Sequence, residues 1–388
     1  MRAIGHTWME WVRTLYPGYF ASVMATGIVS VALLLTQALA LSLALWAIDG
    51  ALLIGLTIVY ALRLARFPRD MRRDLFNPAS AFGFFTIIAG IGVLATRSAL
   101  GGWTTVPAVL TIIAAIAWFT LTYWTFAMLL ITNKRPIQDA LNGSWLIAIV
   151  ATESLATTWA LVTNIDPAQR ETLQFLAYVF WTFGVLLYLI FIALIMYRFF
   201  FLSIRPDDLK PPYWINMGAM AITTVAGIRL LDVAHPTALI ETLRPFIEGF
   251  TVMMWAWGTW WIPLLLIIGF WKYVYAREPI RYHPALWSVV FPLGMYATAV
   301  QLLTHIHGLE FLAAIGPACT WIAFAAWTLV LLGWLWSAAT ATRQALRAER
   351  PAPLAGGAHT RGDIVPAGYA RERRDGEQSK PNEPSRIP

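Results

Sequence analysis

The chain has 388 residues, of which 59% are apolar and 13% are charged, with a net charge of +7 and a single cysteine, Cys319. Its apolar residues come in runs of about twenty or more, the length that crosses the hydrocarbon core of a bilayer. One cysteine excludes a disulfide framework and a thiolate metal cluster. The composition predicts an all-α integral membrane protein.

Taken in chain order, the predicted elements are a lead-in, a membrane domain and a tail. Residues 1–17 resemble an amphipathic cytoplasmic lead-in without a cleavage site. Residues 18–340 form the predicted ten-helix transporter domain, and residues 341–388, rich in Pro, Gly and mixed charge, are expected to be a disordered cytoplasmic tail. The predicted spans are 18–36, 39–62, 79–96, 104–131, 143–164, 173–201, 213–232, 245–271, 284–305 and 309–340.

Basic residues are unevenly distributed between the predicted loops. The loops that follow spans 2, 4, 6 and 8 carry most of the Lys and Arg residues, whereas the alternate loops carry only Arg97, Arg170 and Arg244. The positive-inside rule places the basic loops in the cytoplasm, so both termini of this multi-pass protein are expected on the cytoplasmic side of the cell (inner) membrane. The net charge is therefore a topology signal, and no nucleic-acid partner is expected.

A short pattern repeats where the odd-numbered spans begin. A Pro or Asn that can start a helix is followed three residues later by an aromatic residue: Phe20, Trp145, Trp214 and Trp287. The third span begins at Pro78 and has Phe82 one residue later than the pattern requires. Because the anchors at 17, 78, 142, 211 and 284 are separated by the length of a helical hairpin, five hairpins in series are predicted.

The odd and even spans differ in composition. The odd spans carry small and polar residues at helical spacing, whereas the even spans are bulky and apolar nearly all round. This difference predicts odd helices around a central pore and even helices outside, facing lipid. The candidate pore-lining residues on spans 1, 3 and 7 are Ser22, Thr26, Ser30, Ser80, Gly83, Gly90, Asn216, Thr223 and Gly227. Ordinary helix-packing seams are the alternative interpretation.

Three stretches together resemble one family. They are LYPGYFASVMATGIVSVAL, LNGSWLIAIVATESLA and ALWSVVFPLGMYATA, and the resemblance covers roughly residues 15–340. The family is the tellurite-resistance/dicarboxylate transporter family, which includes bacterial tellurite-resistance proteins, fungal malate permeases, sulfite efflux pumps and the slow anion channels of plant guard cells. The resemblance implies five hairpins around a pore and assembly as a homotrimer. No cofactor is expected from the sequence.

The resemblance also implies a pore gate. In relatives a Phe in a W-x-x-x-F-P setting on the ninth helix blocks the pore, and WSVVFP assigns that role to Phe291. Pro292 cannot donate a hydrogen bond to the Ser288 carbonyl, so a kink is expected that pushes Ser288, Phe291, Met295 and Thr298 toward the pore. A packed Phe beside a common membrane-helix proline is the alternative.

Two ionisable residues within the predicted spans stand out. Glu153 replaces an uncharged, Pro-rich stretch of the channel-like relatives, and near the bilayer midplane it must be protonated, paired or hydrated. Proton coupling and a neutral hydrogen-bonding role both remain open for it. Arg229 near the outer end of span 7 either attracts anions at a vestibule or pairs with Asp232 three residues later.

The sequence predicts a transporter or channel for small anions rather than an enzyme. The candidate solutes are C4-dicarboxylates such as malate, sulfite and tellurite-like oxyanions. A proton-coupled dicarboxylate carrier that uses Glu153 is the alternative. A membrane enzyme or cofactor protein using the scattered histidines has less support, because no metal-ligand spacing is found and His305 and His307, two residues apart, point to different sides of a helix.

Overall fold

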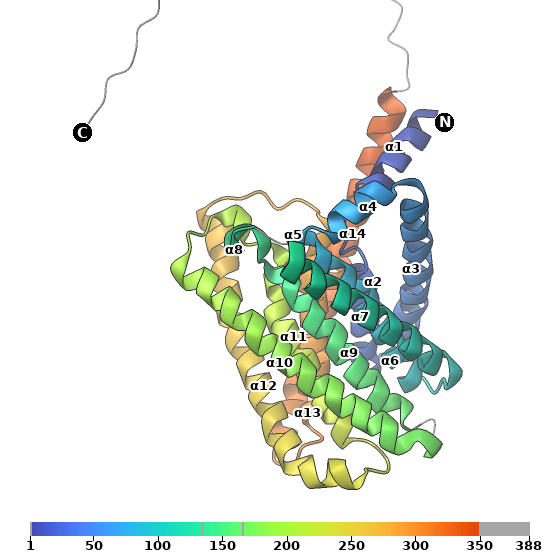
Figure 1. The fold of residues 1–388 in the computed structure, drawn as a ribbon, viewed down its shortest axis with the longest axis vertical. Coiled ribbons are helices and arrows are strands. Elements are labelled where there is room, and N and C mark those ends of the chain that lie inside the picture. Colours follow the sequence, from blue (N-terminus) through green and yellow to red (C-terminus); the bar gives the residue numbers. More distant parts are fainter. Residues whose placement is uncertain (1, 133–134, 165–166, 349–388) are drawn as a thin grey trace, which may run out of the picture. The chain divides into compact units, whose positions relative to one another are not determined.

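The computed structural model describes residues 2–132, 135–164 and 167–348, and within these ranges it contains helices and no strand (Figure 1). Nine helical segments of the described residues have the length and apolar composition of membrane spans, and α2 (Ala21–Leu35) is a shorter apolar helix. The predicted all-α integral membrane fold is therefore confirmed. The division into ten spans and five hairpins stays a prediction.

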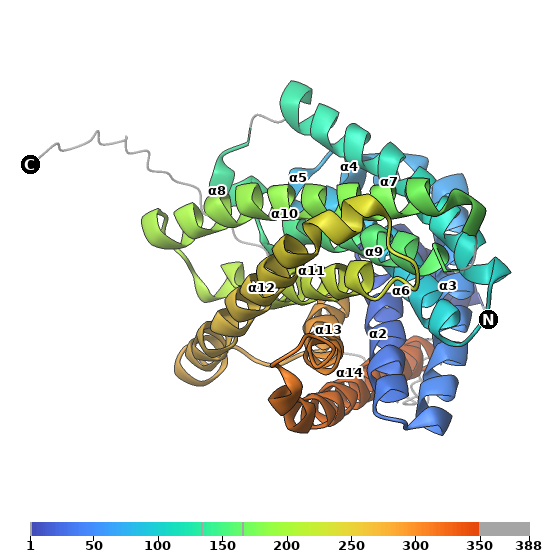
Figure 2. The same ribbon diagram turned by 90° about the horizontal axis from the view of Figure 1, so that it is seen from below.

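Five helices, called the inner helices below, are buried along most of their length. They are α2 (Ala21–Leu35), α6 (Phe85–Leu100), α9 (Ile147–Val162), α11 (Ile215–Leu231) and α13 (Trp287–Leu303). Each packs on the next in this order and α13 packs back on α2, so the five close a ring (Figure 2). Glycine permits this close approach, since a Cβ on Gly294 of α13 would lie 2.9 Å from Ile28 Cγ2 of α2.

Five longer helices, called the outer helices, surround this ring (Figure 2). They are α3 (Leu39–Arg66), α7 (Thr105–Thr132), α10 (Arg170–Phe201), α12 (Ala238–Phe270) and α14 (Ile315–Ala348). Each packs on the inner helix that precedes it in the chain. Large apolar side chains such as Ile58, Leu130 and Phe201 are exposed on them, as expected of surfaces that face lipid.

Short elements connect and start these helices. They are α1 (Arg2–Arg13), α4 (Pro68–Leu75), α5 (Pro78–Ala81), α8 (Ile137–Ala140), the 3-10 turns η1 (Phe82–Phe84), η2 (Gly143–Leu146), η3 (Pro167–Gln169), η4 (Pro206–Asp208), η5 (Pro211–Trp214), η7 (Pro284–Leu286) and η8 (Glu310–Ala314), and the π-helical turn η6 (Trp271–Tyr275).

The repeated sequence anchors are helix starts in the structure. The side chains of Asn77, Asn142 and His283 each accept a hydrogen bond from a backbone N–H two residues later, which satisfies a group that the first turn leaves without a partner. A proline or glycine then begins the turn that leads into α6, α9 or α13. The anchors therefore set where these inner helices begin.

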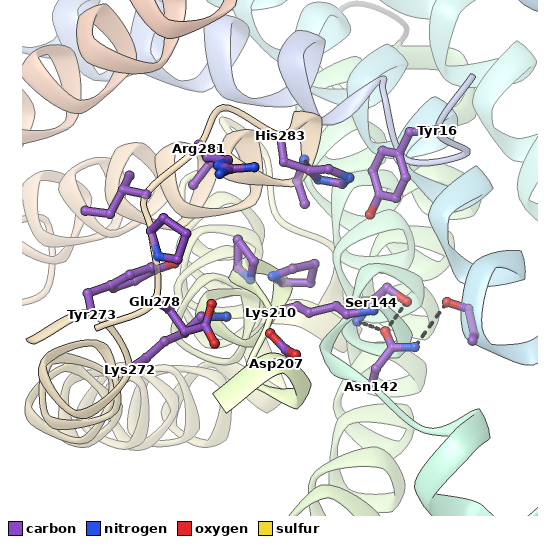
Figure 3. A pocket seen from close by; sticks show the side chains of 17 residues that line it. Tyr16, Asn142, Ser144, Asp207, Lys210, Lys272, Tyr273, Glu278, Arg281 and His283 are labelled. Carbon is purple, nitrogen blue, oxygen red and sulfur yellow. Dashed lines mark hydrogen bonds between the residues drawn. The ribbon is translucent and has the colours of Figure 1, made fainter. Parts of the chain in front are cut away.

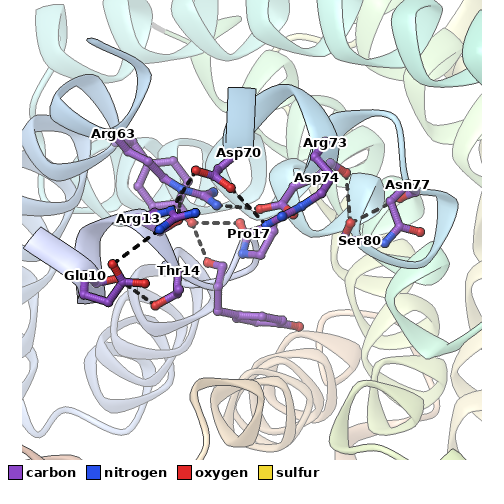
Figure 4. Close-up of polar contacts among 12 residues, drawn as sticks. Glu10, Arg13, Thr14, Pro17, Arg63, Asp70, Arg73, Asp74, Asn77 and Ser80 are labelled. Atoms are coloured by element: carbon purple, nitrogen blue, oxygen red, sulfur yellow. Dashed lines mark hydrogen bonds and ion pairs between the residues drawn. The ribbon is translucent and has the colours of Figure 1, made fainter. Parts of the chain in front are cut away.

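A buried arginine ties the lead-in to the first outer helix (Figure 4). The Arg63 side chain at the end of α3 is 1% exposed; its Nη2 lies 2.6 Å from Asp74 Oδ2 and its Nε donates to the Arg13 carbonyl at 3.1 Å. Arg13 Nε in turn lies 3.0 Å from Asp70 Oδ2 on α4. This polar cluster holds the segment before α2 against α3 and α4.

The last helix reaches beyond the predicted end of the membrane domain at residue 340. The helix α14 ends at Ala348, so residues 341–348 are helical rather than part of an irregular tail. Residues 349–388 of the predicted tail lie outside the described residues.

Candidate functional site

Two chambers and a small cavity are bordered by the inner helices and the segments at their ends. The helix-start chamber lies where α9, α11 and α13 begin and has a volume of about 430 Å³ (Figure 3). The helix-end chamber, of about 360 Å³, lies where α6, α9 and α11 end. Between them is the central cavity, lined by residues from all five inner helices.

The helix-start chamber is rich in polar and basic groups. Lys210, Lys272 and Arg281 line it together with Asp207 and Glu278, so its fixed charges sum to a small positive value. The starts of three inner helices also point their partial positive charge toward it. The arrangement can concentrate anions at this end of the ring.

Two aromatic groups in the same chamber are neutral at pH 7. Burial, followed by the nearby charge of Lys210, lowers the pKa of His283 below its usual value of 6.5. His283 Nδ1 accepts the hydrogen bond from Ala285 N–H at 3.1 Å, so the ring proton lies on Nε2. Tyr16 packs edge-on against this ring, and burial raises the pKa of Tyr16 to about 12.

The central cavity is small and mostly apolar. Its volume of about 10 Å³ has room for about one water molecule. Its lining comprises Ile28, Val31, Val93, Thr96, Ser154, Thr157, Ile222, Val225, Arg229, Met295 and Thr298. Apolar walls with a few hydroxyl groups and one guanidinium suit the passage of a small anion that sheds part of its hydration shell.

Arg229 connects the central cavity to the helix-end chamber. Its side chain, in the last turn of α11, lines both spaces and is 10% exposed. Nη1 lies 3.9 Å from Asp232 Oδ2, a long ion pair, and Nε is buried without a hydrogen-bond partner among the described residues. A buried guanidinium N–H without a partner is costly unless a solute or water supplies an acceptor.

Phe291 lies between the helix-start chamber and the central cavity along α13. Ala285 and Leu286 of η7 line the chamber, whereas Met295 and Thr298 of α13 line the central cavity. Phe291 itself is 0% exposed, so solvent does not reach it from either space.

A family model described as voltage-dependent anion channel matches residues 14–335. The chain belongs to the voltage-dependent anion channel family. The family resemblance found in the sequence is thereby confirmed, and membership makes this protein a membrane transport protein for anions, not an enzyme.

Proteins from a bacterium, an archaeon and a fungus are similar to this chain in sequence. An uncharacterized membrane protein of Mycobacterium tuberculosis is 41% identical over 143 residues, which cover 37% of this chain and 72% of that protein. An uncharacterized transporter of Methanocaldococcus jannaschii is 24% identical, with 83% of this chain and 94% of that protein covered. A sulfite efflux pump of Arthroderma benhamiae is 22% identical, with 83% and 90% covered.

In this member of the anion channel family, the predicted pore-lining residues on α2 face neighbouring helices. Ser22 and Thr26 line a separate apolar cavity of about 90 Å³ beside α14, where Trp327 Nε1 donates to Thr26 Oγ1 at 2.9 Å. Ser30 Oγ hydrogen-bonds with Ser42 of α3 and accepts from Arg97 Nε at 3.0 Å. These placements favour the packing-seam interpretation for the three residues.

Most of the other candidate residues also meet a neighbouring segment. Asn216 Oδ1 accepts from the Tyr188 hydroxyl of α10 at 3.3 Å, and Ser80 Oγ donates to the Asp74 carbonyl at 2.9 Å. A Cβ on Gly83, Gly90 or Gly227 would lie against Gly18, Val23 or Thr251, respectively. Ser288 is buried. Of the predicted site residues, Arg229, Met295 and Thr298 line the central cavity, and their part in conduction stays a prediction.

Glu153 lies in the interface between α9, α10 and α11. Its Oε1 accepts a hydrogen bond from Thr223 Oγ1 at 3.1 Å, while Oε2 has no partner among the described residues. A Cβ on Gly184 of α10 would lie 2.4 Å from Oε1, so glycine makes space for this carboxyl group. The lining of the central cavity includes its neighbours Ser154 and Thr157 but not Glu153.

Sequence reasoning missed several polar residues of the central cavity, notably Thr96 and Ser154. Both residues lie on odd spans, but their spacing in the sequence does not distinguish them from the hydroxyl residues that face outer helices. No group of three His, Cys, Asp or Glu side chains within the described ranges is placed to hold a metal ion.

Proposed function

We propose that this protein conducts small anions along the axis of the inner ring, from one chamber through the central cavity to the other. The observation that carries the proposal is the central cavity itself, to which all five inner helices contribute and at whose end the Arg229 Nε has no hydrogen-bond partner within the described part of the chain. A guanidinium at a narrow, mostly apolar constriction attracts an anion by its positive charge and repels cations. Malate, sulfite and tellurite-like oxyanions are the candidate solutes.

We propose Phe291 as the gate of this path. The proposal is supported by its full burial and by its place in the chain between Leu286, which lines the helix-start chamber, and Met295, which lines the central cavity. An aromatic ring in a narrow bore blocks ions by steric hindrance and by excluding water. Opening then requires the ring to leave the axis, or α13 to move at Pro292.

The orientation and the assembly of the protein are further parts of this proposal. The distribution of Lys and Arg supports the proposal that the helix-start chamber faces the cytoplasm across the inner membrane and that both termini are inside. The family resemblance further suggests a homotrimer with one path in each protomer. Molecular mass in detergent, measured by light scattering, tests the trimer.

Anion flux in proteoliposomes tests the conduction path. The full chain is reconstituted and efflux of malate, sulfite, nitrate and chloride is measured with and without a proton gradient. Phe291→Ala is expected to raise the flux of at least one of these anions about tenfold or more, since it opens the constriction. Phe191→Ala is the matched control, because Phe191 is also buried but lies on the outer helix α10. Equal flux in both variants would exclude the gate, and no flux of any anion would exclude the function.

A proton-coupled dicarboxylate carrier is the second candidate. The observation that favours it is the fully buried carboxyl of Glu153, whose Oε2 has no partner in the described ranges, since an ionisable group buried in a membrane protein commonly serves proton transport. Malate uptake driven by an imposed pH gradient, and its loss in Glu153→Gln, distinguishes the carrier from the channel.

A further inference from the structure

Asp232 is shared between two basic side chains at the end of α11. Its Oδ2 lies 2.9 Å from Nδ1 of His305, which follows α13, and 3.9 Å from Nη1 of Arg229. The short contact is therefore with His305 and the long one with Arg229. Two inner helices that are neighbours in the ring meet through this carboxylate.

The position of Asp232 matters for an anion path. Both Asp232 and Arg229 line the helix-end chamber, so a carboxylate stands beside the one guanidinium that reaches the central cavity lining. Near this chamber a negative charge repels anions and competes with them for Arg229. The charges of Arg229 and Asp232 cancel when His305 is neutral, whereas protonated His305 leaves the three groups with a net charge of +1.

His305 is the titratable group in closest contact with this carboxylate. Its side chain is about half exposed, so protons reach it from solvent. From α12, Arg244 donates to the Leu231 carbonyl and pairs with Glu241 and Glu248. From α6, Arg97 Nε donates to Ser30 and Ser42.

We propose that Asp232 determines how strongly the helix-end chamber attracts anions. When His305 is protonated, it pairs with Asp232, and the Asp232 carboxylate no longer competes with anions for Arg229. The inference rests on the proposed anion path. Histidine changes charge between about pH 5 and 8, and the charge-assisted bond to His305 holds Asp232 more tightly than the neutral contact does. Arg229 is then left to pair with the solute.

Chloride flux tests this inference, because chloride carries the same charge at every pH used. Proteoliposomes with the parent chain are expected to show about threefold to tenfold higher flux at pH 5.5 than at pH 7.5. Asp232→Asn and His305→Lys are each expected to give high flux at both pH values, the first by removing the carboxylate charge and the second by fixing a positive charge. His305→Gln is expected to give low flux at both. His307→Gln is the matched control, since His307 is fully exposed and contacts Glu310 instead.

The outcomes separate this inference from the function on which it rests. The role of Asp232 would be overturned if the parent flux did not depend on pH. It would also be overturned if His305→Lys and Asp232→Asn both kept the pH dependence of the parent. Neither result would contradict anion conduction. The absence of chloride, sulfite and malate flux in the parent would overturn both. Thermal melting of each variant identifies any loss of flux that comes from unfolding, and His305→Lys tests the charge effect without altering Asp232.

Discussion

Gly218 of α11 provides the space that the Pro292 ring of α13 occupies: a Cβ at position 218 would lie 2.9 Å from Pro292 Cγ and 3.1 Å from its Cα. The residue before this proline is Phe291, the proposed gate. The packing of α13 at Pro292 therefore depends on a glycine of the neighbouring inner helix.

Gly218→Ala is expected to lower the free energy of unfolding by about 1 to 3 kcal/mol, the usual cost of adding a methyl group to a filled interface. Thermal melting in detergent measures the effect. Gly269→Ala is the control, because a Cβ on Gly269 of α12 would have no heavy atom of the residues that the structure describes within 4 Å. If both variants melt at the parent temperature, α11 and α13 are not packed this closely.

Glu153→Gln separates the two candidate functions. A glutamine still accepts the hydrogen bond of Thr223 and fits beside Gly184, so the fold is expected to be kept. Because Glu153 does not line the central cavity, anion flux without a pH gradient is expected to stay within about twofold of the parent. Loss of the flux measured without a pH gradient would mean that Glu153 lies on the conduction path.

Asp74→Ala is expected to destabilise the protein by about 3 kcal/mol, because it leaves the buried Arg63 guanidinium without its carboxylate partner. Chemical or thermal unfolding in detergent gives the value. Arg73→Gln serves as the control: its side chain is mostly exposed and its pairs with Asp70 and Asp74 are expected to contribute less than about 1 kcal/mol. Similar losses in the two variants would contradict the buried role of Arg63.

Stability is expected to fall as the pH drops below 6.5, in part through His283. Its pKa in the folded protein is lowered, so between that lowered pKa and 6.5 the unfolded chain binds more protons and acid favours unfolding. Protonation also removes the Nδ1 acceptor that caps the turn before α13. Melting temperatures between pH 5 and 8 check this: His283→Asn, which keeps a capping oxygen, is expected to reduce the acid sensitivity. An unchanged pH profile in this variant would exclude His283 as a cause.

The composition of the spans carried most of the information about the fold. The odd spans are small and polar and became the buried inner helices, whereas the bulky even spans became the outer helices with exposed apolar surfaces. The reason is physical: a helix facing lipid gains from large apolar side chains, and a helix surrounded by others needs small ones. The anchors at Asn142 and Pro284 likewise coincide with helix starts because capping groups act locally.

The sequence by itself determined the membrane class, the family and the position of Phe291 along its helix. Only the tertiary structure decided which face of each inner helix meets the central cavity. Helical spacing groups Ser22, Thr26 and Ser30 on related turns, but small and polar residues suit a packing seam as well as a pore, and here they meet α14 and α3. The contact between Asp232 and His305 likewise joins residues far apart in the chain, which local periodicity does not encode.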